Sequence, residues 1–134
     1  MIHLNWAWII SCLLLFVCGT TIAGESVYDC KVLHVYTLNK NGILEQSAYE
    51  DELKGQAFRV SRLTGKITGS VLPTTLASSI KIVNEGSTEN SFKAIAHFKE
   101  QLQTIEVQEF RDGITKAFVS SSMGGAGIVT GVCE

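Results

Sequence analysis

The sequence predicts an all-β domain, an antiparallel sandwich or small barrel of seven or eight strands with one or two short helices, behind an N-terminal signal peptide. Beyond residue 24, apolar residues recur mostly at every second position and seldom at the 3.6-residue spacing of a helix. Groups of turn-forming residues interrupt this alternation at short intervals. One cysteine lies near each end of the domain, which favours a fold whose first and last strands are neighbours.

Eight segments are predicted as strands because they are rich in β-branched and aromatic residues and are bounded by turns. They are residues 27–38, 57–63, 67–72, 79–83, 91–99, 103–110, 115–121 and 127–133. Helical character is limited to residues 47–54 and 73–78, where Pro73 suits the first turn of a helix. Seven or eight strands with frequent turns indicate a sandwich or a small barrel.

An uncharged apolar leader precedes all 24 Lys, Arg, Asp and Glu residues. Its core, residues 6–18, suits a signal peptide and is shorter than the roughly 20 apolar residues of a bilayer span. Small residues at Thr21 and Ala23 predict cleavage after Ala23, giving a signal peptide (1–23), a single β-rich domain (24–134) and a periplasmic or secreted location. An uncleaved N-terminal anchor is the alternative, because the first five residues contain no Lys or Arg. Bulky residues before Cys18 argue against a lipidated cysteine.

The remaining charges are balanced and interspersed, with 11 basic and 13 acidic residues. Nucleic-acid-binding proteins normally cluster positive charge, so the pattern argues against nucleic acid and against anionic membrane surfaces as partners. A membrane is expected as a partner only if the leader stays attached.

Two cysteines, Cys30 and Cys133, remain after cleavage. An isolated pair in an exported chain is expected to form one disulfide, which requires Cα atoms within about 7 Å. We expect this bond to bring the two edges of the sheet together, as in a barrel or a tight sandwich. A catalytic or metal-binding thiol is the alternative, but only His34 lies nearby and neither cysteine belongs to a CxxC motif.

Strand alternation predicts which side chains form the interior. His97 falls on the outer face with Lys93 and Lys99, whereas the inward set is Phe92, Ala94, Ala96, Phe98, Ile105 and Val107. Small alanines in this set are compatible with a ligand-holding barrel, but a filled core is the favoured interpretation.

The sequence contains no serine-hydrolase, metalloprotease, phosphate-binding or dinucleotide motif. His34 and His97 lack further ligands at a usable spacing, so no metal and no cofactor are expected. The glycine-rich residues 124–127 precede a strand and are predicted to form a hairpin loop; residues 120–122, three serines, are predicted as a polar strand end or loop.

Two groups of charged residues could also carry chemistry. Glu50, Asp51 and Glu52 would point about 100° apart on a helix, so a solvated face near its amino end is expected. Arg59 and Arg62 fall on opposite faces of a strand and are expected as solvated cations; an inward arginine paired with Glu109 is the alternative.

Short motifs resemble a group of small exported bacterial proteins of unknown function. They are the strand and turn F-x-V-x-R-x-T-G at residues 58–65, the cysteine at position 30 and the terminal T-G-x-C at residues 130–133. The resemblance implies a bacterial envelope location and supports the paired cysteines. It implies no activity, so no functional residue is transferred.

Taken together, these patterns favour a non-catalytic binding or interaction module in the bacterial envelope. Its partner is expected to be a protein, a glycan or a small apolar ligand, bound through the barrel mouth or the outer face. The alternative is a hydrolase-type enzyme whose site has no recognisable motif. The sequence therefore predicts no catalytic, cofactor or metal residue, and a disulfide between Cys30 and Cys133.

Overall fold

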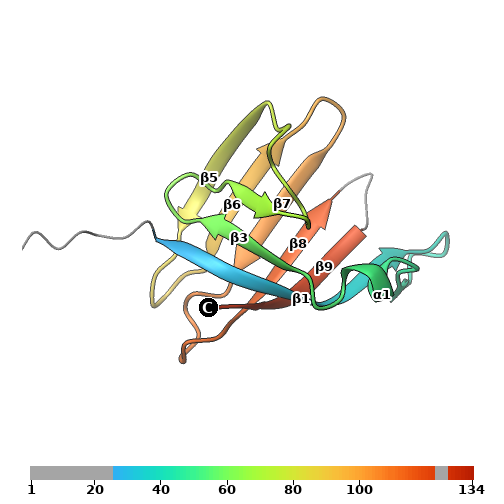
Figure 1. The fold of residues 1–134 in the computed structure, drawn as a ribbon, viewed down its shortest axis with the longest axis horizontal. Coiled ribbons are helices and arrows are strands. Elements are labelled where there is room, and N and C mark those ends of the chain that lie inside the picture. The colour runs from blue at the N-terminus through green and yellow to red at the C-terminus, as the bar shows by residue number, and fades with distance from the viewer. Residues whose placement is uncertain (1–25, 123–126) are drawn as a thin grey trace, which may run out of the picture.

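The structure, a computed structural model, describes residues 26–122 and 127–134, which form one curled antiparallel β-sheet and one short helix (Figure 1). The predicted all-β fold class is confirmed. The elements are β1 (Val27–Leu38), β2 (Leu44–Gln46), α1 (Glu50–Leu53), β3 (Ala57–Ser61), β4 (Ile67–Gly69), β5 (Ser79–Glu85), β6 (Phe92–His97), β7 (Leu102–Val107), β8 (Lys116–Ser122) and β9 (Gly127–Cys133).

The strand order is β4-β3-β1-β9-β8-β7-β6-β5, and β2 pairs with the far end of β1. The first and last strands are therefore neighbours, as predicted from the cysteines. The expectation that they bring the two edges together is wrong, because β1 and β9 lie inside the sheet and β4 and β5 are its ends. Since β4 and β5 are not paired to each other, the sheet is a half-barrel.

All eight predicted strands are present, but the structure contains one strand that was not predicted and lacks one predicted helix. β2 was not predicted, because its three exposed residues carry no alternation against a core. The predicted helix at 73–78 is instead part of an irregular connection, and β4 ends at Gly69, before Leu72 adopts a positive φ of 51°. The buried Thr74 hydroxyl accepts the Ile67 N–H at 2.8 Å, which fixes this connection across the end of the sheet. Of the loop predicted at 124–127, residues 124–126 lie outside the described residues, and Gly127 begins β9 with a positive φ of 84°.

The concave side of the sheet holds the core. Inward-pointing residues of seven strands are almost completely buried, in agreement with the predicted inward set except that Phe98 is only half-buried. They include Tyr28, Val32, Val35, Phe58, Val60, Ile67, Phe92, Ala94, Ile105, Val107, Phe118 and Val129. His97, Lys93 and Lys99 are exposed, as predicted.

Side chains close the gap between the two ends of the sheet. Gly65, in the turn between β3 and β4, lies so close to β5 and β6 that a Cβ there would meet the side chains of Ala94 and Ile80 at 2.9 and 3.0 Å. The buried Gln103 amide of β7 also donates to the carbonyl of Leu72, in the connection after β4, at 2.8 Å. The half-barrel is thus completed by packing in place of backbone pairing.

Antiparallel pairing gathers the connections at two opposite ends of the sheet. At the end where β1 begins lie Ser26, the β3–β4 turn, the β5–β6 turn, the β7–β8 connection and Glu134 (Figure 1, left side). We call this the leader end. The β1–β2 hairpin, α1 and the β4–β5 connection lie toward the opposite end. None of the helices among residues 26–122 and 127–134 has the length and apolar character needed to span a membrane.

Candidate binding site

A groove of about 290 Å³ crosses the outer face of β5, β6, β7 and β8. Its apolar side chains are Val83, Ile95 and Val119, of which Val83 is 53% and Val119 37% exposed. Its polar side chains come from the same four strands: Lys93, Thr104, Glu106 and Ser121. The groove lies opposite the packed core, on the convex side of the sheet.

Strand register explains why these residues meet. Lys93 lies opposite Glu106, and Glu106 opposite Val119; one row further along, Ile95 lies opposite Thr104, and Thr104 opposite Ser121. Outward residues of neighbouring strands lie about 5 Å apart, so the two rows form one continuous surface. Val83 joins this surface at a bulge in β5, where the register shifts between Ile82 and Asn84.

The polar side chains of the groove satisfy one another. The Lys93 ammonium and the Glu106 carboxylate are 3.5 Å apart, and the Thr104 and Ser121 hydroxyls are hydrogen-bonded at 2.6 Å. The lining residues include neither histidine nor cysteine, and the Glu106 carboxylate faces the Lys93 ammonium. The chemistry offered is an apolar contact bordered by one charge pair and two hydroxyls, which suits binding.

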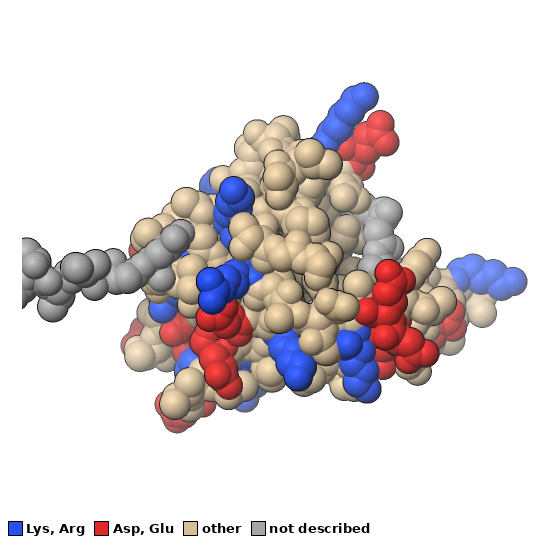
Figure 2. Space-filling model, in the orientation of Figure 1, with Lys and Arg blue, Asp and Glu red and all other residues tan. Residues whose placement is uncertain are grey.

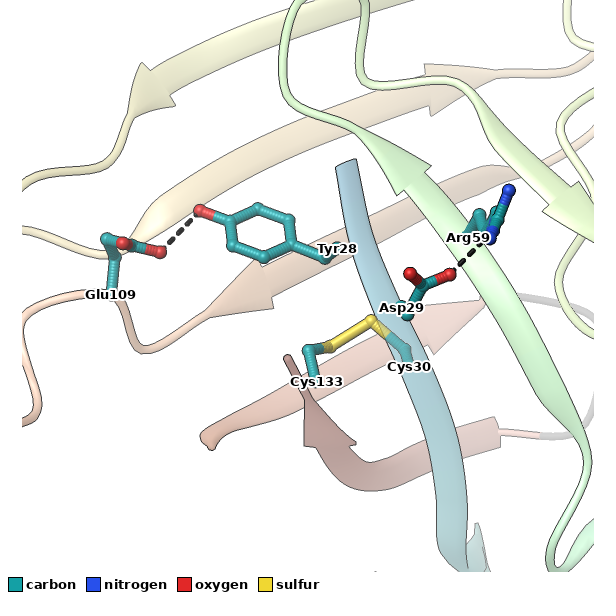
Figure 3. The surroundings of a disulfide bond; sticks show 6 residues. All are labelled: Tyr28, Asp29, Cys30, Arg59, Glu109 and Cys133. Atoms are coloured by element: carbon teal, nitrogen blue, oxygen red, sulfur yellow. Dashed lines mark hydrogen bonds and ion pairs between the residues drawn. A yellow bond between two sulfur atoms is a disulfide. The ribbon is translucent and has the colours of Figure 1, made fainter. Parts of the chain in front are cut away.

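A second hollow, of about 430 Å³, lies on the outer face of β1, β3 and β4. Arg59 and Asp29 border it and form an ion pair at 2.6 Å, with both side chains more than half exposed (Figure 3). Exposed ion pairs of this kind contribute little to stability, typically about 0–1 kcal/mol. Arg59 is therefore the exposed cation expected from the sequence, paired with a carboxylate on the neighbouring strand.

Arg62 differs from that expectation. Its guanidinium lies 3.9 Å from the Glu109 carboxylate and 5.0 Å from the centre of the Tyr28 ring. The Tyr28 hydroxyl donates to Glu109 at 2.6 Å (Figure 3). The pairing with Glu109 given as the alternative is thus observed, but Arg62 is half-buried in the turn after β3 and is not a buried arginine of the strand. That turn folds over the end of β1 beside the β7–β8 connection. Burial raises the pKa of Tyr28 above its ordinary value, and the hydrogen bond to Glu109 raises it further.

The predicted disulfide joins Cys30 of β1 to Cys133 of β9 (Figure 3). The two residues are directly opposite, with Cα atoms 3.9 Å apart. The adjacent pair, Asp29 and Glu134, exchanges both backbone hydrogen bonds at 2.9 Å, so the cysteines occupy the closer, non-hydrogen-bonded position. Both sulfur-bearing residues are buried, and neither offers a free thiol for catalysis or for a metal.

The prediction that Glu50 lies on a solvated helix face is wrong. Asp51 and Glu52 are exposed, as expected, but Glu50 is 6% exposed and turns toward β1. Its carboxylate accepts the backbone N–H of Val35 at 3.0 Å and lies 3.7 Å from the His34 ring. The Val35 N–H bond, followed by the charge of His34, lowers the pKa of Glu50. The side chain replaces a strand partner on the edge of β1 between the end of its pairing with β3, at Lys31, and the start of its pairing with β2, at Tyr36.

The remaining residues considered from the sequence lie apart. His34 and His97 belong to different strands, and within the described part of the chain no three His, Cys, Asp or Glu side chains are grouped so as to hold a metal. Ser120 is inside β8, where its buried hydroxyl donates to the Thr104 carbonyl at 2.7 Å. The three serines are thus part of a strand and do not form a loop.

Sequence reasoning missed the groove because its residues come from four strands, and only the register brings them together. The residue types at the outward positions of β6, β7 and β8 could have indicated the groove. Ile95, Thr104 and Val119 are β-branched there, where charged residues would be ordinary on a solvated face.

Comparisons with known proteins return no relative: no family model, no curated protein and no solved structure matches the chain. The resemblance to small exported bacterial proteins therefore stays a prediction from short motifs.

Proposed function

We propose that this protein is a non-catalytic binding domain of the bacterial envelope, periplasmic or secreted, that holds an apolar side chain of a protein partner in the groove across β5–β8. The observation that carries the proposal is the exposed apolar surface of Val83, Ile95 and Val119 between polar neighbours that already satisfy one another. A partner that covers this surface removes apolar area from water, which favours binding, and it does not have to break an existing hydrogen bond.

The size of the groove favours a side chain over a larger ligand. Pockets for drug-sized molecules usually measure about 300–1,000 Å³ and enclose most of the ligand. This groove has about 290 Å³ and is open along the sheet, so it suits one aliphatic or aromatic group presented by a larger body. The Lys93–Glu106 pair at its border offers both charges to polar atoms beside that group.

Two features support an exported location. The leader has the composition of a signal peptide. The buried bond between Cys30 and Cys133 is typical of an oxidising compartment. Intact-mass measurement of the protein exported by a bacterial host should give a chain that begins near Gly24. Recovery of the full-length chain in the membrane fraction would contradict cleavage and favour the anchor.

The groove can be tested by nuclear magnetic resonance with three small probes. We expect N-acetyl-phenylalanine amide to shift the backbone signals of Ile95, Thr104 and Val119. N-acetylglucosamine and hexanol represent the glycan and the small apolar ligand, and a stronger response to either at these residues would replace the proposed partner class. Shifts confined to other parts of the sheet would contradict the groove as the site.

A matched pair of variants sharpens this test. Val119→Lys places a charge in the groove and should abolish the response to the phenylalanine probe. Ala117→Lys lies two residues earlier on the same exposed face of β8, outside the lining, and should keep it. Equal responses of the two variants would overturn the proposal. The hydrolase alternative has no specific observation in its favour among the described residues, since the buried Ser120 hydroxyl is bonded to a backbone carbonyl.

A further inference from the structure

The leader joins the domain at a defined place. Ser26 is the first described residue, and its carbonyl accepts the Arg62 N–H at 2.9 Å. Ala23 precedes Ser26 by three residues, so the extended chain cannot place it more than about 11 Å away. Any bilayer that holds the apolar leader must therefore come close to the leader end of the sheet.

That end carries three exposed large apolar side chains. Leu63, in the β3–β4 turn, is 71% exposed; in the β7–β8 connection, Phe110 is 40% and Ile114 83% exposed. The 3.9 Å contact between Arg62 and Glu109 joins these two connections, and Leu63 and Phe110 each follow one of its partners in sequence. We call Leu63, Phe110 and Ile114 the apolar rim.

The charges around the apolar rim are mixed. Arg111 lies over the Phe110 ring at 5.5 Å, and Lys116 donates to the Arg111 carbonyl. Asp112 and Glu134 lie at the same end, and Figure 2 shows both blue and red residues on the left side of the domain. The end has no strong net charge, so the apolar side chains are what would draw it to lipid. Arginine beside an aromatic ring suits the boundary between headgroups and acyl chains.

We infer that the apolar rim is a membrane-contact surface, which rests on the lipid headgroups and inserts Leu63, Phe110 and Ile114 while the domain is attached to its leader. The occupant follows from the position of Ser26, because a bilayer that holds the leader lies within a short stretch of chain of this end of the molecule. The inference depends on the leader entering a membrane and is independent of the groove, which lies on the outer face of β5–β8.

Hydroxyl-radical footprinting of the full chain can test this residue by residue. The full-length protein is placed in phosphatidylcholine vesicles, and oxidation of individual side chains is read by mass spectrometry against the exported mature form in buffer. We expect oxidation of Leu63 and Ile114 to fall at least fivefold in the vesicles. Leu76 and Leu38, which are 88% and 64% exposed toward the opposite end, serve as controls and should be oxidised equally in both samples.

Other results would overturn the inference. Equal oxidation of Ile114 in both samples would show that the apolar rim stays in water. Equal protection of Leu76 and Ile114 would show general shielding. Protection of Ile114 that also appears in concentrated mature protein without lipid would assign the apolar rim to a second copy of the chain. Loss of probe binding in the groove would leave each of these readings unchanged, so failure of the two proposals can be told apart.

Discussion

At the scale of single residues, two glutamates complete hydrogen bonding where regular strand pairing stops. On the edge of β1 that faces α1, pairing with β3 ends at Lys31 and pairing with β2 begins at Tyr36, so the Glu50 carboxylate accepts the Val35 N–H at 3.0 Å in place of a strand. At the leader end, Glu109 accepts the Tyr28 hydroxyl at 2.6 Å and faces Arg62. Both contacts join segments far apart in sequence, which is why single-strand patterns could not show them. Each changes the ionisation of one group and so makes stability depend on pH.

Glu50 should stabilise the fold at neutral pH and not in acid. Its folded-state pKa is lowered, chiefly by the Val35 N–H, so its contribution is present above the unfolded pKa of about 4.3 and is lost as pH falls through the folded pKa. Glu50→Gln should therefore unfold at lower urea concentration than the parent protein at pH 7, and the difference should shrink toward pH 3. Glu52→Gln, an exposed neighbour, is the control. A difference that stays constant with pH would contradict this account.

The stabilisation that Tyr28 contributes should depend on pH in the opposite direction. Its folded-state pKa is raised, so its contribution is fully present below the unfolded pKa of about 10 and is lost as pH rises through the folded pKa. Tyr28→Phe removes a hydrogen bond to a carboxylate and should cost about 1.5–3 kcal/mol of unfolding free energy at pH 7. This cost should diminish above pH 10 in urea titrations. Tyr49→Phe, at a 59% exposed position, should change little; a similar loss there would indicate a nonspecific effect.

At the scale of elements, the positions of the long strands could be predicted because their residues alternate between the core and the solvent. β1 shows this best, since its predicted and observed bounds agree even though it contains a bulge. Two segments could not be predicted from the sequence. β2 is held only by pairing with the end of β1, and the segment after β4 is irregular because of the positive φ at Leu72 and a Gln103 side chain from a distant strand. Distant partners of this kind leave no local pattern.

Gly131 shows how closely β9 and β1 approach beside the bulge. A Cβ at Gly131 would collide with the Lys31 carbonyl oxygen, and it would meet the Phe118 ring at 2.7 Å. The carbonyl belongs to the backbone of a central strand and cannot move without disturbing the pairing. Gly131→Ala should therefore lower the unfolding free energy by about 1–3 kcal/mol or more in urea titrations.

Gly42→Ala is the matched control for this substitution. Gly42 has a positive φ of 78°, unlike Gly131, but a Cβ there would meet nothing within 4 Å. The control should cost only the backbone strain of about 1–2 kcal/mol. If Gly131→Ala were the milder of the two, the close approach of β9 to β1 would be wrong.

At the scale of the whole molecule, strand order separates what sequence could predict from what it could not. The cysteine pair predicted that β1 and β9 are neighbours, because a disulfide requires two close Cα atoms. It could not show that both strands lie inside the sheet, since that depends on β3 pairing with the free side of β1. The same long-range order creates the groove, whose walls come from four strands. The fold class was therefore predictable, whereas the candidate site required the register.

The two proposed surfaces are compatible in one molecule. The leader end gathers the connections beside Ser26, whereas the groove runs across the outer face of β5–β8. A domain resting on a bilayer by its leader end would keep that outer face open to a partner. Cleavage after Ala23 would leave the strands of the groove intact, because its lining residues belong to β5–β8.

The bond between Cys30 and Cys133 should be the largest single contribution to stability that one covalent change can remove. It spans 103 residues and so restricts almost the whole unfolded domain. Replacing both cysteines by alanine should lower the unfolding free energy by about 2–5 kcal/mol in urea titrations. Cys30→Ala alone should be worse than the double variant, because Cys133 is then free to pair between molecules, which non-reducing electrophoresis would show as a dimer. Thiol titration of freshly exported, denatured and unreduced protein should find no free thiol; two titratable thiols would refute the bond and remove the covalent link between β1 and β9.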